Sequence, residues 1–548
     1  MNDLIAPIAD PVPADSAGAR EIGFSLPPRY NASEILFNNL RRGDRLAVTG
    51  PAGRRTYREL CDDAGRWGNA LISLGLRRGD RVLMFLDDTP CYPAAFFGAV
   101  RAGFVPLLIN LLTPPDLLNF YLQDSGTTVA VVEAAFADRF DRVACEGTAL
   151  KTLIAVNGTA PGGSAVDTVI EASRVADAPA QLDAADTHRN EMAFWMYSSG
   201  STGRPKGIVH LQHDMAYTNE SYGKNVLKLT PDDICFSVPK IFFAYGFGNS
   251  VTFPFCAGAA SLLLSGQPKP AAVFDAIARF RPSVFFALPT VYTALAKAPE
   301  APHADLSSLR LAISAAEILS AEVFGGWKAL TGIEIVEGLG STEVLHVYLS
   351  NTVEHKRLAS AGRRVPGYEI KLCDADEKEV GSEQEGILWV RGDSNTPLYW
   401  NRPDKTAETI RDGGWIYTGD RFHRDAGGFY FFRGRADDLV KISGQWVYPM
   451  EVELCLNDHP AVRECAVLAL ELPDRRMTLK AFVTMNSTTF DAGAATRQLQ
   501  DYVKEKLLPH KYPRSVEFLR DLPKTGTGKI DRQALLNLAR ADREARQS

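Results

Sequence analysis

The sequence has little that would suit binding to nucleic acid, passage through a membrane or secretion. Lys and Arg number 60 against 66 Asp and Glu, so the formal net charge is −6, whereas nucleic-acid binders usually carry a basic excess. The most apolar stretches are shorter than ~18 residues or carry a charge, and we expect no transmembrane helix. Residues 1–18 contain no Lys or Arg and no long apolar core, and we expect no secretory signal.

Closely spaced cysteine pairs are also missing. None of the eight cysteines stands in a CxxC pair, which excludes a zinc ribbon or a thioredoxin-type motif. Cysteines scattered through a long chain are typical of reduced thiols in a cytosolic protein. We therefore expect a cytoplasmic protein that contacts neither nucleic acid nor membrane, and that is a monomer or a homodimer.

Most of the chain shows strands alternating with helices. Short apolar runs at residues 81–86, 104–110 and 127–132 are separated by helical patterns, and runs at 261–264, 284–288, 309–314 and 333–337 repeat the arrangement. This alternation predicts the α/β fold class, with parallel sheets covered by helices on both faces.

The pattern changes in the last third of the chain. After about residue 386, short strands are separated by turn residues, which is typical of hairpins, and a compact α+β pattern begins near residue 438. The charged, Gly-containing stretch 433–438 suits a hinge. We predict a large N-terminal domain over residues 1–436, ending in a β-barrel-like part, and a small C-terminal α+β domain over residues 437–548.

The sharpest motif lies at residues 197–207, which read YSSGSTGRPKG and follow the apolar run 192–196. Three glycines and four Ser and Thr hydroxyls can present N–H and O–H donors in one loop, and Lys206 adds a positive charge, as a phosphate site requires. The alternative is a flexible linker, but a linker rarely follows a buried strand. The loop lacks the GxxxxGK[ST] pattern, and no GxGxxG opens a helix, so neither a Walker loop nor a dinucleotide fold is indicated.

This loop resembles the phosphate loop of the adenylate-forming superfamily, which includes acyl-CoA synthetases, nonribosomal adenylation domains and luciferases. Four further segments resemble motifs of that family and occur in the family's order. They read GSTE at 340–343, YTGD at 417–420, GRADD at 434–438 and PKTGTGK at 523–529. The resemblance covers nearly the whole chain.

The resemblance implies a role for each motif. It implies that ATP or AMP is bound by Ser198, Ser199, Gly200, Ser201, Thr202, Gly203, Lys206, Gly340, Ser341, Thr342, Asp420 and Arg435. It implies catalysis by Lys529, Glu343 and Tyr245, with Glu343 also the Mg²⁺ ligand. It places the hinge at Asp437, and it assigns Lys441 and Gly444 to the step that forms a thioester with CoA.

Three of these residues also have ordinary structural alternatives. Glu343 offers the oxygen ligand that Mg²⁺ accepts, but a carboxylate at the start of a helix would look the same. Asp420 could accept two ribose hydroxyls or cap a turn. Lys529 lies in a Gly-flanked loop, where it could swing into a site and stabilise the charge that develops at the α-phosphate, or remain a solvated surface lysine. The ordered set of motifs favours the functional roles.

The nature of the activated acid is indicated by residues 240–249, where four aromatics stand among small residues. They could line a flat slot for a ring, or pack in an ordinary core. This segment and 340–349 resemble those of benzoate-CoA ligases and related aryl-CoA ligases. The resemblance implies an acyl pocket lined by Ala244, Tyr245, Gly340, His346 and Val347.

The exact acid stays open at this point. Val347 is smaller than the residue expected in a strict benzoate enzyme, and His346 could be a buried structural histidine. Benzoate, a hydroxy- or aminobenzoate, or an alicyclic or heteroaryl carboxylate are all compatible with the segment. The neutral run Phe243, Ala244, Tyr245 argues against an amino-acid substrate.

We therefore predict an AMP-forming acid–thiol ligase that uses ATP, Mg²⁺ and CoA. A carboxylate and ATP give an acyl-adenylate and pyrophosphate, and the CoA thiol then gives an aroyl-CoA and AMP. The C-terminal domain acts as a mobile lid that rotates between the steps, because Lys529 is needed only in the first. The alternatives are a stand-alone enzyme that loads an aryl acid onto a carrier protein, and a non-catalytic adenylate-binding regulator. The resemblance also makes Lys529 a candidate target of a protein acetyltransferase.

Overall fold

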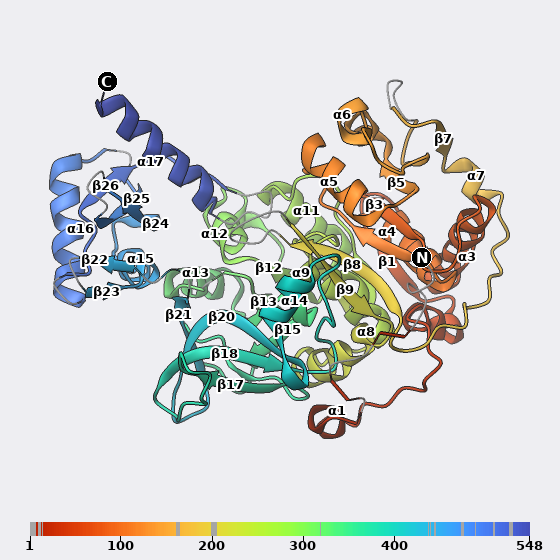
Figure 1. The fold of residues 1–548 in the computed structure, drawn as a ribbon, viewed down its shortest axis with the longest axis horizontal. Helices are drawn as coiled ribbons and strands as arrows, with labels where there is room; N and C mark the ends of the chain where they lie inside the picture. The colour runs from red at the N-terminus through yellow and green to blue at the C-terminus, as the bar shows by residue number, and fades with distance from the viewer. Residues whose placement is uncertain are drawn as a thin grey trace. The chain divides into compact units, whose positions relative to one another are not determined.

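The computed structural model describes most of the chain in two compact units (Figure 1). The described residues are 7–8, 12–13, 15–159, 165–198, 205–317, 319–436, 438, 440–442, 445–472, 476–487, 489–507, 510–524 and 530–547. The first unit comprises Met1–Arg357, Ala361–Ile370 and Val390–Tyr417, and the second comprises Leu358–Ser360, Lys371–Trp389 and Thr418–Ser548.

A nine-stranded sheet forms one half of the first unit. Its strands in spatial order are β16 (Arg363–Arg364), β15 (Val347–Ser350), β14 (Ile335–Gly340), β13 (Leu311–Ser314), β12 (Val284–Ala287), β10 (Ile234–Ser237), β11 (Ala260–Leu262), β1 (Leu46–Thr49) and β2 (Arg55–Thr56). The strands from β14 to β1 run parallel, whereas β15, β16 and β2 are antiparallel to their neighbours. The parallel centre confirms the α/β prediction.

A seven-stranded sheet forms the other half. Its spatial order is β7 (Thr168–Glu171), β6 (Thr152–Val156), β5 (Val129–Glu133), β3 (Arg81–Phe85), β4 (Val105–Leu108), β8 (Met192–Ser198) and β9 (Lys206–Leu211). All neighbours are parallel except β8 and β9, which lie side by side in yellow in Figure 1 and pair antiparallel. β8 ends at Ser198 and β9 begins at Lys206, which leaves fewer residues between them than the dozen or so that a parallel crossover needs.

Helices cover these sheets, and one apolar core contains residues of both sheets. The longest helices of the unit are α3 (Tyr57–Ser73), α4 (Cys91–Arg101), α5 (Pro115–Ser125), α11 (Pro270–Phe280), α12 (Pro289–Lys297) and α13 (Ala321–Thr331). The α3 helix begins with a capping box between Thr56 and Glu59. It packs closely on α4, because a Cβ at Gly98 would lie 2.4 Å from the carbonyl oxygen of Ala64.

The second unit begins in a twisted sheet and ends in a small α+β fold. Strands β17 (Glu369–Cys373), β18 (Glu385–Arg391) and β20 (Trp415–Arg424) run across the boundary between the units, and β21 (Tyr430–Arg435) pairs antiparallel with β20. This pairing confirms the predicted hairpin character of the region after residue 386.

The α+β fold at the end of the chain is built on a three-stranded sheet of β24 (Val462–Glu471), β25 (Met477–Met485) and β26 (Ser515–Phe518). Its helices are α15 (Pro449–Asn457), α16 (Ala492–Lys506) and α17 (Arg532–Gln547), and β22 (Val440–Ile442) pairs antiparallel with β23 (Gln445–Val447). Val467, Leu479 and Leu499 lie in its apolar core. In the described part of the chain, no helix combines the length and the apolar character that a membrane span requires.

Candidate active site

The predicted phosphate loop connects two strands that pair at its base. Ser198 ends β8, Lys206 begins β9, and these two residues are register partners. Met192–Met196 are fully buried, as the sequence predicts for the strand before the loop. Five predicted nucleotide-binding residues lie outside the described residues, namely Ser199, Gly200, Ser201, Thr202 and Gly203.

Tyr399 lies between two of the predicted site residues. Its ring centroid is 4.1 Å from the Lys206 Nζ, and its hydroxyl donates a 2.9 Å hydrogen bond to Glu343 Oε1. A β-bridge to Ile208 places Tyr399 along β9. Burial raises the pKa of the Tyr399 hydroxyl, and the negative charge of Glu343 raises it further. Tyr399 therefore remains a hydrogen-bond donor and fixes the direction of the Glu343 carboxylate.

The GSTE motif continues from the end of β14 into the short helix η7 (Thr342–Val344), and its backbone is held from outside. The Thr342 carbonyl oxygen accepts a 2.9 Å hydrogen bond from His210 Nε2. The Glu343 carbonyl oxygen accepts one of 2.7 Å from the Thr396 backbone N, and the Val344 carbonyl oxygen accepts one of 2.9 Å from Ser394 Oγ. Ser341 Oγ is buried and makes no hydrogen bond among the described residues. A buried hydroxyl without a partner is a group that a bound nucleotide could satisfy.

Three aromatic rings surround His346, and only Tyr245 among them was predicted from the sequence to line the acyl pocket. The His346 ring lies 5.3 Å from that of Tyr222, 5.6 Å from that of Tyr245 and 4.6 Å from that of Phe253, centroid to centroid. Nε2 is 3.3 Å from the Tyr245 carbonyl oxygen. Burial lowers the pKa of His346 to about 3, so the ring is neutral at physiological pH. Nδ1 is buried and has no hydrogen-bond partner among the described residues.

The predicted pocket and the GSTE motif meet at the neighbouring strands β14 and β15. Gly340 is the register partner of Val347 across β14 and β15, and a Cβ at Gly340 would lie 2.4 Å from the His346 carbonyl oxygen. A glycine is therefore required where the two strands approach. Val347 is 1% exposed, and Ala244 begins the short helix α9 (Ala244–Phe247).

The remaining predicted nucleotide residues belong to the second unit. Asp420 on β20 and Arg435 on β21 are register partners, and Arg435 Nη1 lies 3.0 Å from Asp420 Oδ1. Arg435 also donates to the Thr418 carbonyl oxygen at 3.2 Å. The pair is held by the hairpin itself, which fixes the direction of the Asp420 carboxylate.

Several predicted residues of the C-terminal fold lie outside the described part of the structure. These are Asp437, Gly444 and Lys529, together with the side chain of Lys441, whose backbone belongs to β22. The base of the loop that carries Lys529 is described. Lys524 forms an ion pair with Glu464, and the backbone N of Asp531 donates to the Pro523 carbonyl oxygen at 2.8 Å.

The predicted magnesium site depends on which side chains could donate oxygen ligands. Among the described residues no group of three or more His, Cys, Asp or Glu side chains could enclose a metal ion. Mg²⁺ commonly takes one or two carboxylates and completes its shell with phosphate oxygens and water. Glu343, oriented by Tyr399, fits that mode of binding.

Family models match most of the sequence. The model of the AMP-binding enzyme matches residues 37–400, and that of the AMP-binding enzyme C-terminal domain matches residues 451–529. The chain belongs to the AMP-binding enzyme family. Both the phosphate-loop strands and the GSTE motif of this AMP-binding enzyme fall within the first match, and the Lys529 loop falls within the second.

Similar proteins extend over almost the full chain. The benzoate–CoA ligase of Thauera aromatica is 40% identical over 513 residues, which cover 92% of this chain and 96% of that protein. The 4-hydroxybenzoate–CoA/benzoate–CoA ligase of Rhodopseudomonas palustris is 37% identical over 95% of this chain and 96% of that protein. Among solved structures, an anthranilate CoA ligase in complex with anthranoyl-AMP has a TM-score of 0.88 at 36% identity, covering 95% of this chain and 99% of that one.

Proposed function

We propose that this AMP-binding enzyme is an ATP-dependent ligase that activates a benzoate-like aromatic acid as its acyl-adenylate and transfers the acyl group to CoA. The observation that carries the proposal is the short segment from Gly340 to Val347. Its first half supplies the nucleotide motif with Glu343, and its second half supplies the pocket residues His346 and Val347. The curated relatives at 40% and 37% identity, which act on benzoate or 4-hydroxybenzoate with CoA, support the same acid class.

The chemistry needs no nucleophile from the protein. The substrate carboxylate attacks the α-phosphate of ATP, a bond to phosphorus forms, and pyrophosphate leaves. The thiol of CoA then attacks the acyl carbonyl, the thioester forms and AMP leaves. Catalysis in such a reaction is positioning and stabilisation of developing charge.

Each part of the site supports one of these tasks in the proposal. Lys206 and the phosphate loop hold the phosphates, and Asp420 binds the ribose hydroxyls. Glu343 would hold Mg²⁺, which when bound would offset the charge of the phosphates. The neutral ring of His346, with its neighbouring aromatics, lines the slot for the acid. Lys529 stabilises the charge that develops at the α-phosphate in the first step alone.

The proposal extends to the domain division and to regulation. We assign residues 1–436 and 437–548 to two domains that rotate about Asp437 between the two steps, with Lys441 and Gly444 serving the thioester step. We further propose a cytoplasmic location and acetylation of Lys529 by a protein acetyltransferase, which would remove the positive charge that adenylation uses. Mass spectrometry after incubation with acetyl-CoA and an acetyltransferase tests the last point.

Steady-state kinetics with purified protein test the function itself. Benzoate, hydroxybenzoates, aminobenzoates, cyclohexane carboxylate and heteroaryl carboxylates are compared with MgATP, each with and without CoA. We expect the highest kcat/KM with an aromatic acid, and AMP released in equal amounts with aroyl-CoA. Adenylate formation without CoA consumption would instead indicate loading of a carrier protein. Absence of ATP–pyrophosphate exchange with every acid would contradict an enzymatic role.

A further inference from the structure

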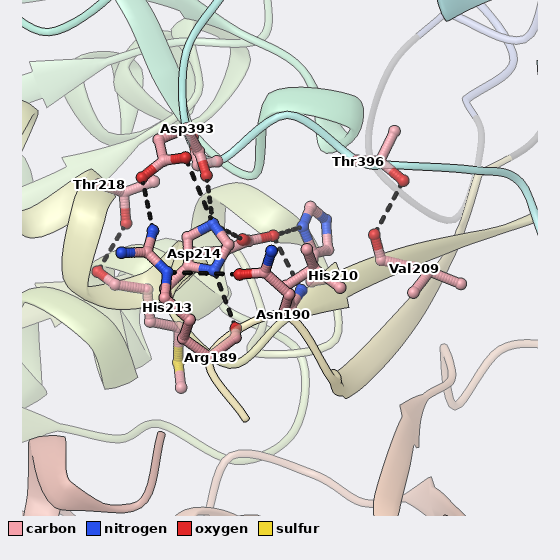
Figure 2. Close-up of polar contacts among 12 residues, drawn as sticks. Arg189, Asn190, Val209, His210, His213, Asp214, Thr218, Asp393 and Thr396 are labelled. Atoms are coloured by element: carbon pink, nitrogen blue, oxygen red, sulfur yellow. Dashed lines mark hydrogen bonds and ion pairs between the residues drawn. The ribbon is translucent and has the colours of Figure 1, made fainter. Parts of the chain in front are cut away.

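A cluster of charged and polar side chains around His210, His213 and Asp214 is drawn in Figure 2, and His210 also contacts the Thr342 carbonyl oxygen of the GSTE motif. His210 is the penultimate residue of β9, and His213 directly precedes the helix α8 (Asp214–Thr218). The side chains of His210, His213 and Asp214 are 0% exposed. Buried groups of this kind are costly unless each has hydrogen-bond partners, so their contacts are informative.

Both ring nitrogens of His210 face acceptors. Nδ1 lies 2.8 Å from Asp214 Oδ2, and Nε2 lies 2.9 Å from the Thr342 carbonyl oxygen. A carbonyl oxygen can only accept, so the Nε2 atom must carry a hydrogen for this contact to be favourable. The same holds whether the proton shared with Asp214 sits on Nδ1 or on the carboxyl group. His210 therefore donates a hydrogen bond to the backbone of the GSTE motif.

The orientation of His210 is fixed on two further sides. Asp214 Oδ2 also accepts a 3.0 Å hydrogen bond from the Leu211 backbone N, which holds the carboxylate. The Phe194 ring stacks on the His210 ring, with 5.1 Å between centroids and 28° between planes. The imidazole thus has one rotamer and one donor direction available.

A second histidine anchors the loop that holds the next two carbonyls. His213 Nδ1 lies 2.9 Å from the Arg189 carbonyl oxygen, and Nε2 lies 2.7 Å from the Asp393 carbonyl oxygen. Arg189 Nη2 also forms a 2.9 Å ion pair with Asp393 Oδ2. The loop that begins at Asp393 supplies Ser394 and Thr396, which donate to Val344 and Glu343. Through His210 and the loop held by His213, the cluster therefore fixes the carbonyl groups of Thr342, Glu343 and Val344 in η7.

We propose that His210 is a positioning residue for the adenylation step of this ligase. Its Nε2–H holds the Thr342 carbonyl, and this sets the peptide that leads into Glu343. His210 does not touch the substrate, and it acts through the carboxylate that would hold Mg²⁺. Replacing a residue that orients a metal ligand typically lowers metal affinity or activity 10- to 100-fold. The inference rests on the proposed function, because that function assigns Mg²⁺ to Glu343.

Two matched amide variants separate the two hydrogen bonds of His210. The amide nitrogen of Gln can occupy the position of Nε2, so His210→Gln keeps a donor for Thr342. The amide nitrogen of Asn reaches only the position of Nδ1, so His210→Asn keeps the Asp214 contact and loses the one to Thr342.

The readouts are metal binding and the two half-reactions. Mn²⁺ binding in the presence of a non-hydrolysable ATP analogue is followed by electron paramagnetic resonance, together with the Mg²⁺ dependence of adenylation and the thioester step from supplied acyl-adenylate. We expect His210→Asn to weaken Mn²⁺ binding and adenylation by tenfold or more, with the thioester step within about threefold of wild type. His210→Gln should stay within about threefold in every assay.

The outcomes distinguish this inference from the proposed function. If wild type is inactive with every acid, the proposed function fails. If wild type is active and His210→Asn matches it in Mn²⁺ binding, the inference is overturned. Equal losses in His210→Asn and His210→Gln would also overturn it, because the side chain would then matter only for packing. Melting temperatures within a few degrees of each other establish that the variants are folded.

Discussion

The hydroxyl of Tyr399 donates a 2.9 Å hydrogen bond to the Glu343 carboxylate. The two residues are 56 positions apart in the chain, and the contact exists because Tyr399 lies along β9. The same ring faces the Nζ of Lys206 at 4.1 Å. One phenol therefore links the lysine of the phosphate loop to the carboxylate of the GSTE motif.

Tyr399→Phe removes that hydrogen bond and keeps the ring. A hydrogen bond to a charged group contributes about 1.5–3 kcal/mol when buried, and Glu343 is only half-buried, so we expect the low end of that range. We predict a roughly tenfold lower kcat/KM for MgATP in adenylation. Tyr57→Phe is the matched control, because its hydroxyl donates to the Ala259 carbonyl oxygen within the core. The control should lower the melting temperature and leave kcat/KM for MgATP unchanged. An unchanged kcat/KM in Tyr399→Phe as well would remove Tyr399 from the site.

The size of the ring pocket can be tested at Val347. Val347→Ala removes two methyl groups from a side chain that is 1% exposed. Each such methylene-sized change is worth roughly 1–3 kcal/mol of discrimination. We predict that the ratio of kcat/KM for ring-substituted benzoates to that for benzoate rises by roughly tenfold or more. Val131→Ala in the buried strand β5 is the control, and it should destabilise the protein without moving the ratio. A constant ratio in Val347→Ala would mean that Val347 does not face the ring.

Glu337 on β14 gives a prediction about pH. Burial raises the pKa of its carboxyl group from 4.5 to about 8, although the Leu319 backbone N donates to it at 3.2 Å. Between pH 4.5 and 8 the folded state holds a proton that the unfolded state has lost. Stability from this group is complete below pH 4.5 and is lost as pH rises through 8.

Glu337→Gln mimics the protonated carboxyl and does not titrate. We therefore expect the melting temperature of wild type to fall relative to that of the variant as the pH rises from 5 to 9, measured without nucleotide. Any other buried group that titrates, such as Asp88 with a pKa raised to about 7 by burial, contributes equally to both proteins. Parallel pH profiles would show that Glu337 is ionised throughout.

Local sequence signals predict most of the strands and helices but not the contacts that complete the site. The apolar run 192–196 predicts β8, and Pro270 marks the start of α11, because both signals act within a few residues. Tyr399 carries no such signal, since its position depends on pairing with β9. From sequence His210 would be interpreted as an ordinary core histidine, because its contact with Thr342 joins residues 132 positions apart and only the one with Asp214 is local.

The sequence pattern also did not predict the antiparallel strand pairs at the edges of both sheets. Alternation of strands and helices predicts parallel pairs, and it says nothing of strands joined by short loops, as at β8–β9 and β14–β15. The predicted nucleotide residues Ser198 and Lys206 lie at the first of these pairs, and the predicted pocket residues Gly340 and Val347 lie at the second. Sequence motifs therefore named candidate residues there, while their arrangement required the fold.

Lys529 is the residue on which the two-step account depends. Lys529→Ala should lower adenylation by 10²–10³-fold or more, as expected when a preorganised donor to developing charge is removed. Thioester formation from supplied acyl-adenylate should continue near the wild-type rate, because the account requires Lys529 only while the carboxylate attacks the α-phosphate. Lys524→Ala is the matched control, since it removes the Lys524–Glu464 ion pair at the base of the same loop and leaves Lys529 in place.

The most direct test measures both half-reactions of wild type and Lys529→Ala side by side, with benzoate and MgATP for the first and benzoyl-adenylate and CoA for the second. The account predicts that wild type performs both, that Lys529→Ala loses the first and keeps the second, and that Lys524→Ala stays close to wild type in both. Equal losses of the two half-reactions in Lys529→Ala, or benzoyl-adenylate that does not react with CoA on the wild-type protein, would contradict it.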